Sequence, residues 1–331
     1  MAYIWAMNQT LDHYRQAIES YLQTELAFGE PAELYAPIRY ILELGGKRMR
    51  PVLALLGADL YGADTRQALP AAAAVEIFHN FSLVHDDIMD AAPLRRGRPS
   101  VHKKWNDNAA ILSGDAMLIL AYRQLDAYDA ALFKPMAALF SRTALEVCEG
   151  QQYDMDFEER DDVSTEAYLE MIRLKTAVLL GCALQLGAMS GGASEADQEA
   201  LYAFGINLGM AFQLQDDYLD AFGDPAVFGK QPGGDIMANK KTFLYLSALE
   251  SLEGAASKEL RDLFTVRPAE PGAKVTRVLE LFRQAGADGL IKDAIDAYTQ
   301  QALQHLDSVK AEGAAKDLLT AFAGELRTRN Y

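Results

Sequence analysis

Apolar residues recur at intervals of three and four along almost the whole 331-residue chain. Such positions share one face of an α-helix, so the spacing predicts helices. Alternating runs of Val, Ile and Thr bounded by hairpin turns, which would predict strands, are absent from the sequence. We therefore expect an all-α fold. Its helices are predicted over residues 11–26, 31–44, 51–61, 66–90, 109–128, 135–149, 165–189, 195–222 and 242–252, followed by four shorter ones that end near residue 329.

Helix boundaries follow from local signals. Pro31, Pro51 and Pro135 lie near expected first turns, where the missing amide hydrogen costs little. Ser194 precedes Asp197 by three residues, which is typical of a helix start. No linker rich in Pro, Ser or Gly interrupts the pattern, and half of the residues are hydrophobic. We expect a single domain over residues 1–331, with one large helical bundle burying the core.

Two aspartate triplets each end an apolar helix. "DDIMD" occupies residues 86–90 and "DDYLD" residues 216–220, and a loop with cations follows each. Positions i and i+4 share a helix face, so the first and last aspartates of each triplet project together and repel one another. A bound cation would relieve this repulsion. Oxygen ligands without His or Cys suit Mg²⁺ or Mn²⁺. The alternative is a pair of solvated helix ends, which the apolar helices before both triplets disfavour.

Cations are spaced around these triplets in an otherwise acidic chain. "GGKRMRP" at 45–51 places three of them behind a glycine pair that lets the backbone approach a ligand. Guanidinium groups suit a phosphate held directly, and carboxylates suit one held through a metal. We therefore expect a phosphate ligand between the first triplet and the arginines that follow it. The alternative is that Arg95, Arg96 and Arg98 only pair with the aspartates.

Net charge and cysteine usage limit the partners and the compartment. The formal charge of −16 disfavours broad binding to nucleic acid or to an anionic membrane surface. Cys148 and Cys182 lie in hydrophobic stretches, which indicates buried thiols and a reducing cytosol. The amino terminus lacks the pattern of a secretory leader. The uncharged run 176–194 contains Gln185, Ser190 and several glycines, which indicates a core helix and not a membrane span. We expect a cytoplasmic protein without a transmembrane segment.

Six segments in chain order carry a family resemblance. They are "GGKRMRP", "HDDIMDAAPLRRGRP", "GQQYDM", "LKTA", "FQLQDDYLD" and "GKQPGGDI" with "NKKT". In this order and approximate spacing they resemble the trans-isoprenyl diphosphate synthases, also called polyprenyl synthetases, along most of the chain. The resemblance implies the all-α isoprenoid synthase fold, a helical bundle around a central cavity. It further implies a homodimer and three Mg²⁺ ions, for which Mn²⁺ can substitute.

The resemblance also implies roles for individual residues. Asp86, Asp90 and Asp216 are similar to direct Mg²⁺ ligands, and Asp87, Asp217 and Asp220 to residues that support them directly or through water. The positions similar to those that hold isopentenyl diphosphate are Lys47, Arg50, His79 and Arg96. Those similar to cations that hold the allylic diphosphate are Arg95, Lys175, Lys230 and Lys240. Thr176 and Gln213 match positions that flank the nascent carbocation and the diphosphate. His79 could instead be a plain core histidine.

The implied reaction is the head-to-tail condensation of isopentenyl diphosphate with an allylic prenyl diphosphate. Electrostatic stabilisation of the departing diphosphate would carry it, so no nucleophile and base pair is needed. A class I terpene cyclase and a squalene-type head-to-head synthase would lack "GGKRMRP". A noncatalytic regulatory subunit would have lost motif residues, and none is lost here.

Product length is expected to depend on the helix that ends in the first triplet. Two residues separate Asp87 from Asp90, as in the subtype whose aromatic side chains just before this motif stop the growing tail. Ser82 lies about one turn before Asp86, and Phe81 flanks it. A large residue at 81 beside a small one at 82 resembles short-chain members. We expect a product of fifteen to twenty carbons, twenty more than fifteen.

Overall fold

The computed structural model describes residues 2–25, 29–223, 233–268, 270 and 272–328. The described chain forms two compact units, and each is built from three separate stretches of sequence. The first unit contains 1–141, 182–202 and 310–318, and the second contains 142–181, 203–309 and 319–331. The expectation of a single domain stays a prediction.

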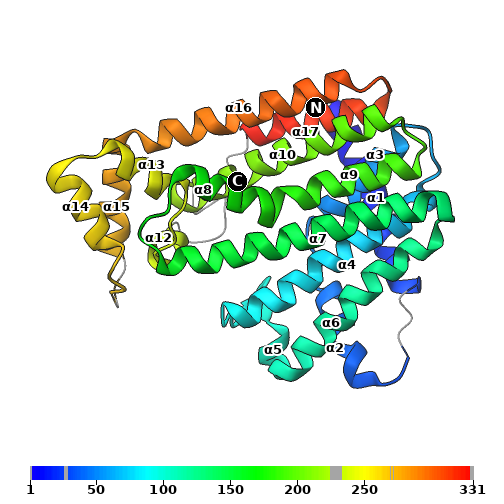
Figure 1. Cartoon of the computed structure of the whole chain (residues 1–331), viewed down its shortest axis with the longest axis horizontal. Coiled ribbons are helices and arrows are strands. Elements are labelled where there is room, and N and C mark those ends of the chain that lie inside the picture. Colours follow the sequence, from blue (N-terminus) through cyan, green and yellow to red (C-terminus); the bar gives the residue numbers. More distant parts are fainter. Residues whose placement is uncertain (1, 26–28, 224–232, 269, 271, 329–331) are drawn as a thin grey trace. The chain divides into compact units, whose positions relative to one another are not determined.

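The first unit is built around two long helices, α4 and α6, which lie side by side (Figure 1). Eight consecutive residues of α4, 71–78, are buried, so this helix is enclosed on all faces over two turns. Its start is fixed by Asp64, whose side chain accepts the amide hydrogen of Arg66 at 2.9 Å. The helices of this part of the chain are α1 (Ala2–Glu25), α2 (Ala32–Glu43), α3 (Met49–Asp59), α4 (Thr65–Met89), α5 (Val101–Lys104) and α6 (Asp107–Gln124), and a short 3₁₀ turn (Leu125–Ala127) follows.

The second unit contains most of the carboxyl-terminal half of the chain. Its helices are α8 (Thr165–Ile172), a π-helical stretch (Arg173–Ala177), α12 (Gly234–Ala238), α13 (Phe243–Ser251), α14 (Gly254–Leu263), α15 (Gly272–Ala285) and α16 (Ala287–Ser308). Four further helices have residues in both units, namely α7 (Ala130–Glu159), α9 (Val178–Ser190), α10 (Glu195–Phe222) and α17 (Ala314–Thr328).

The predicted all-α class is confirmed, with one small exception among the described residues. A two-stranded antiparallel hairpin pairs β1 (Leu94–Arg95) with β2 (Arg98–Pro99). The predicted start of α10 is confirmed, because the Ser194 hydroxyl accepts the amide hydrogen of Asp197 at 3.3 Å.

Three details of the sequence interpretation are wrong. Helix α7 begins five residues before Pro135, which lies inside it, and continues past Gly150. Of the four closing helices, α16 has 22 residues and is not short. Cys148 is exposed on α7, whereas Cys182 is buried as expected.

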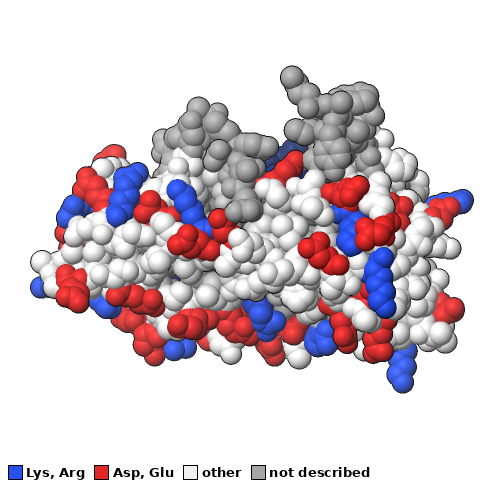
Figure 2. Space-filling view, turned by 90° about the horizontal axis from the view of Figure 1, so that it is seen from above, with Lys and Arg blue, Asp and Glu red and all other residues white. Residues whose placement is uncertain are grey.

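One helical stretch, Thr165–Ser190, has the length and composition of a membrane span. Its mean hydropathy is 1.3, but 78% of the apolar window is buried inside the protein. Burial to this extent is what a core helix shows. The surface in Figure 2 carries many acidic and fewer basic side chains, in keeping with the net charge of −16.

Candidate active site

The first aspartate triplet lies at the carboxyl end of α4. Asp86 is half-buried and Asp90, the last residue of this end, is exposed. Asp87 is buried and pairs with Arg95, whose Nε lies 3.1 Å from Oδ1 and 3.2 Å from Oδ2. For this pair the structure shows the alternative, in which arginine and aspartate contact each other directly, and the phosphate ligand between them stays a prediction. A carboxylate with no solvent contact needs a cation beside it, and Arg95 supplies it.

The β1–β2 hairpin positions Arg96. Its turn residues, Arg96 and Gly97, have φ angles of 52° and 74°, the left-handed pair that a tight two-residue hairpin turn requires. A left-handed arginine costs about 1–2 kcal/mol, and such residues gather at functional sites. The guanidinium lies against the backbone of Gly46, where a Cβ would be only 2.7 Å from the guanidinium carbon. Gly46 also has a φ angle of 132°, which residues with a side chain rarely adopt, so the backbone here favours glycine.

Arg50 and Arg96 form a cation cluster around the His79 ring, and Lys47 lies on the loop just before α3. Arg50 Nη1 lies 3.1 Å from His79 Nε2. Burial, and then the charges of Arg50 and Arg96, hold the pKa of His79 well below its usual 6.5. His79 is therefore neutral and accepts a hydrogen bond from Arg50. The histidine is not a plain core residue, because charged groups surround it.

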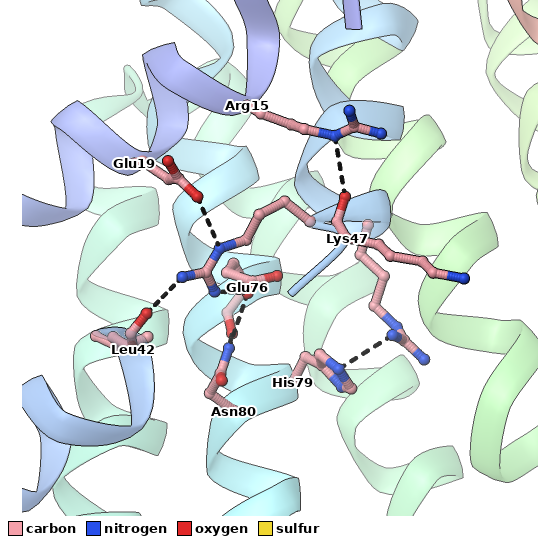
Figure 3. A network of polar contacts seen from close by, with 9 residues as sticks. Arg15, Glu19, Leu42, Lys47, Glu76, His79 and Asn80 are labelled. Carbon is pink, nitrogen blue, oxygen red and sulfur yellow. Dashed lines mark hydrogen bonds and ion pairs between the residues drawn. The ribbon is translucent and has the colours of Figure 1, made fainter. Parts of the chain in front are cut away.

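A buried ion pair supports this loop from behind. Arg48 is 4% exposed and pairs with Glu76 of α4, which is 3% exposed. The same guanidinium donates to the carbonyl of Leu42, and Asn80 donates to Glu76 Oε1 at 2.9 Å (Figure 3). Arg15 Nε donates to the carbonyl of Lys47 at 3.3 Å. The loop is thereby fixed to α1, α2 and α4.

The second aspartate triplet lies on α10. Asp216 and Asp220 are half-buried. Asp217 is buried and accepts hydrogen bonds from the Tyr168 hydroxyl and from Gln213 Nε2, the latter at 3.1 Å. Burial, with Asp235 nearby, raises the pKa of Asp217 well above its usual 3.8, although both hydrogen bonds oppose the shift. In both triplets the middle aspartate is thus buried and bonded to other side chains of the protein.

The last aspartate of this triplet holds a neighbouring helix. Asp220 Oδ2 accepts the amide hydrogen of Asp235 at 2.9 Å, at the amino end of α12. The backbone carbonyl of Asp220 accepts from Gly233 at 2.6 Å. These contacts place Asp235 close to the triplet.

A cavity of about 120 Å³ lies beside these carboxylates in the second unit. Thr176 Oγ1 donates to Gln213 Oε1 at 3.1 Å, so these two predicted site residues are brought together. Lys175 pairs with Asp154. The cavity walls that matter for chemistry are Lys175, Thr176, Gln213, Asp217, Asp235 and Lys240.

Lys175 and Thr176 belong to the π-helical stretch that joins α8 to α9. Such insertions are rare and frequent at functional sites, because they turn side chains away from the regular helical register. Gly150 of α7 packs against this stretch: a Cβ there would lie 2.3 Å from the backbone nitrogen of Lys175. This contact explains why a glycine lies inside α7 at this position.

The sequence interpretation missed several residues of this region. Asp154 and Asp235 stand inside quoted motifs and were assigned no role, although an acidic residue in each was a usable signal. Tyr168 gave no signal, since nothing distinguishes it from other tyrosines. Lys241 Nζ donates to the carbonyl of Phe157 at 3.1 Å near the carboxyl end of α7, a structural role. Lys230 lies outside the described residues.

The carboxylates fit Mg²⁺ in donor chemistry. Each triplet offers two oxygen donors one helical turn apart, with neither His nor Cys among them. No group of three acidic, His or Cys side chains able to hold an ion gathers within the described residues. An ion there would complete its shell with water and phosphate oxygens, which is how Mg²⁺ is bound at phosphate sites.

Phe81 and Ser82 lie on α4 below the first triplet. Both are half-buried, and the Ser82 hydroxyl donates to the carbonyl of His79 at 2.9 Å. The Phe81 ring centroid is 5.5 Å from that of Phe78 and 4.8 Å from that of His85. Phe78 is buried and meets Phe140 at 5.5 Å. A continuous set of aromatic side chains therefore follows α4 away from the triplet.

Comparison with known proteins decides the family. Residues 31–282 match the family model described as polyprenyl synthetase. The chain belongs to the polyprenyl synthetase family. A geranylgeranyl diphosphate synthase of Methanosarcina mazei is 38% identical over 320 residues, covering 95% of each chain. A geranylfarnesyl diphosphate synthase of Natronomonas pharaonis is 35% identical and covers 96% of each.

Solved structures agree with this assignment. A crystal structure of a geranylgeranyl pyrophosphate synthase has a TM-score of 0.92 and 52% identity, covering 97% of this chain and 99% of its own. The corresponding enzyme of Pyrococcus horikoshii has a TM-score of 0.92 and 29% identity, covering 99% and 100%. The polyprenyl synthetase described here is a short-chain trans-prenyltransferase with the isoprenoid synthase fold. A terpene cyclase or a regulatory subunit is not favoured.

Proposed function

We propose that this enzyme condenses isopentenyl diphosphate with an allylic prenyl diphosphate and releases diphosphate. The neutral His79 held by Arg50 is the observation that carries the assignment of a diphosphate-binding group. Lys47, Arg50 and Arg96 supply positive charge for the diphosphate of isopentenyl diphosphate, and His79 adds a hydrogen bond without adding charge.

The allylic substrate is assigned to other cations. Lys175 and Lys240 line the cavity of the second unit. Arg95 pairs with Asp87 through Nε and Nη2, and we assign its Nη1 to a phosphate oxygen. Lys230 keeps the same assignment from its motif. These cations stabilise the oxygen anions of the departing diphosphate.

We propose that Asp86, Asp90, Asp216 and Asp220 are the Mg²⁺ ligands and that three ions are bound, with Mn²⁺ able to substitute. Asp87 and Asp217, both buried and hydrogen-bonded, support them. Bound Mg²⁺ would neutralise the charge that develops on the leaving diphosphate. The oxygens of Thr176 and Gln213 stabilise the allylic carbocation, and the released diphosphate takes the final proton.

The proposed product has fifteen to twenty carbons, twenty more than fifteen. Support comes from the half-buried Phe81 above the buried Phe78 and from relatives named geranylgeranyl diphosphate synthases. We also propose that the enzyme is a cytoplasmic homodimer in which Thr165–Ser190 is a core helix and no segment spans a membrane. Support for a dimer comes from exposed apolar side chains of α6, namely Ile111, Leu112 and Ile119.

Turnover with radiolabelled isopentenyl diphosphate tests the proposal. Each allylic starter is offered separately, with Mg²⁺ and with a chelator. We expect label to enter an extended prenyl diphosphate only with an allylic starter and only with metal. Incorporation that persists in the chelator would refute the metal assignment, and no incorporation with any starter would refute the proposed reaction.

A further inference from the structure

Arg48 occupies a position between two proposed ligands of isopentenyl diphosphate. Lys47 precedes it, and Arg50 follows in the first turn of α3. Arg48 itself has left-handed backbone angles, φ 48° and ψ 33°, and its carbonyl accepts the amide hydrogen of Val52 at 3.1 Å to start the helix. The backbone of Arg48 therefore sets the direction in which the loop ends and the helix begins.

The side chain of Arg48 turns away from this surface into the protein. Its guanidinium pairs with Glu76 and donates to the carbonyl of Leu42, and Nε lies 3.8 Å from Glu19 Oε1. Glu76 is also held by Asn80 (Figure 3). Since Glu76 lies three residues before His79, the ion pair ties the loop to the helical turn that carries the histidine.

A gain in folding stability does not explain the buried Arg48–Glu76 pair or the left-handed backbone of Arg48. A buried ion pair is seldom more stabilising than apolar side chains of similar volume. A left-handed arginine is strained as well. Features that cost stability and persist are typical of sites where they hold functional groups in place.

Resting on the proposed function, we propose that Arg48 and Glu76 are positioning residues that set the affinity for isopentenyl diphosphate without touching it. The pair fixes Lys47 on the loop and Arg50 at the start of α3 relative to His79 on α4. The inference deepens the assignment of the cation cluster, because it separates the residues that bind the diphosphate from those that hold them.

The charge-neutral double variant Arg48→Met/Glu76→Leu tests this. It removes one positive and one negative group, so the net charge near the cluster is unchanged. We expect Arg48→Met alone to lower the melting temperature and raise KM for isopentenyl diphosphate about tenfold, with kcat and KM for the allylic substrate within about twofold. In the double variant the melting temperature should recover while KM for isopentenyl diphosphate stays at least about fivefold raised.

Two further variants keep the test decisive. Arg48→Lys keeps the charge but cannot reach Glu76 and the Leu42 carbonyl together, so it should also raise KM for isopentenyl diphosphate selectively. Ser113→Ala is the matched control, since it deletes the hydrogen bond that the buried Ser113 donates to the Leu34 carbonyl at 3.0 Å in the same unit. It should lower the melting temperature and leave both KM values unchanged.

The inference is overturned if the double variant regains the wild-type KM for isopentenyl diphosphate. It is also overturned if the allylic KM rises by the same factor or if Ser113→Ala reproduces the effect. A wild-type enzyme that fails to incorporate isopentenyl diphosphate would instead refute the proposed function, so the two failures are distinguishable.

Discussion

At the scale of single residues, the site depends on groups whose ionisation the fold controls. His79 is kept neutral by burial and by surrounding arginines. The pKa of Asp217 is instead raised, by burial and by Asp235, which favours its protonated form. Both shifts favour the uncharged state, as expected where charged groups of one sign are crowded away from water.

His79 should make stability depend on pH. Its folded-state pKa is depressed, so below the unfolded value of about 6.5 the unfolded chain binds the proton more readily. The stability that the neutral histidine contributes is therefore fully present above pH 6.5. It is lost as the pH falls from 6.5 towards the pKa of the folded state. We expect the melting temperature of the wild type to fall relative to that of His79→Gln between about pH 6.5 and 5. If the melting temperatures of the two proteins change equally with pH across this interval, the depressed pKa of His79 is contradicted.

At the scale of elements, α4 carries both His79, which we propose binds the diphosphate, and the proposed floor for the product tail. One helical turn rises ~5.4 Å, about the length of one extended isoprene unit. The ring of Phe81 lies above that of Phe78, which is buried against Phe140. The next barrier below Phe81 is therefore Phe78.

Substitution at the floor should change product length. Phe81→Ala should lengthen the dominant product by about one five-carbon unit, because the tail then stops at Phe78. Ser82→Phe should shorten it to fifteen carbons or fewer, since a ring one turn before Asp86 blocks the tail early. Chromatography of the dephosphorylated products measures both. If the distribution of product lengths is unchanged in both variants, α4 does not form the floor and another helix must.

The contact between α7 and the π-helical stretch can be tested by its glycine. In Gly150→Ala the new Cβ would lie 2.3 Å from the backbone nitrogen of Lys175. We expect a loss of about 1–3 kcal/mol in the free energy of unfolding and lower turnover as Lys175 shifts. Gly289→Ala in α16 is the control, because nothing lies within 4 Å of its Cβ, and it should gain about 0.5–1 kcal/mol. If Gly150→Ala and Gly289→Ala unfold at the same urea concentration, the close contact of Gly150 with Lys175 is contradicted.

The helices and the motifs were predictable from the sequence because both depend on local spacing. The apolar period gave nearly every long helix, and the triplets and cations stood in recognisable segments. Contacts distant in sequence were not predictable. A side chain at Gly150 of α7 would meet the backbone of Lys175, which no local pattern indicates. The sequence left open whether Arg95 pairs with the aspartates, and the hairpin returns it to Asp87. Asp235 approaches the second triplet only through the fold of α12.

At the scale of the whole molecule, we propose that an acidic enzyme binds its anionic substrates through local groups of cations. The net charge is −16, yet the guanidinium groups of Arg50 and Arg96 lie around the neutral His79. We therefore expect association with substrate to be local, and the acidic surface elsewhere to repel polyanions.

The proposed dimer can be tested on α6. Leu112 and Ile119 are each 60% exposed, and glutamate at both positions should prevent a second copy from packing there. We expect Leu112→Glu/Ile119→Glu to sediment as a monomer where the wild type sediments as a dimer. Leu290→Glu on α16, where the leucine is 44% exposed, should leave the wild-type value unchanged. A double variant that still sediments as a dimer would exclude this face.

The central claim is that carboxylates of the two triplets bind the metal that drives diphosphate departure. The most direct measurement is turnover at saturating Mg²⁺ for Asp86→Ala and for Asp216→Ala, with Asp307→Ala, an exposed aspartate of α16, as the control. We predict a loss of several orders of magnitude in both, with melting temperatures equal to or above that of the wild type because like-charge repulsion is relieved, and no change in the control. Activity above about a tenth of the wild-type value in either triplet variant would contradict the claim.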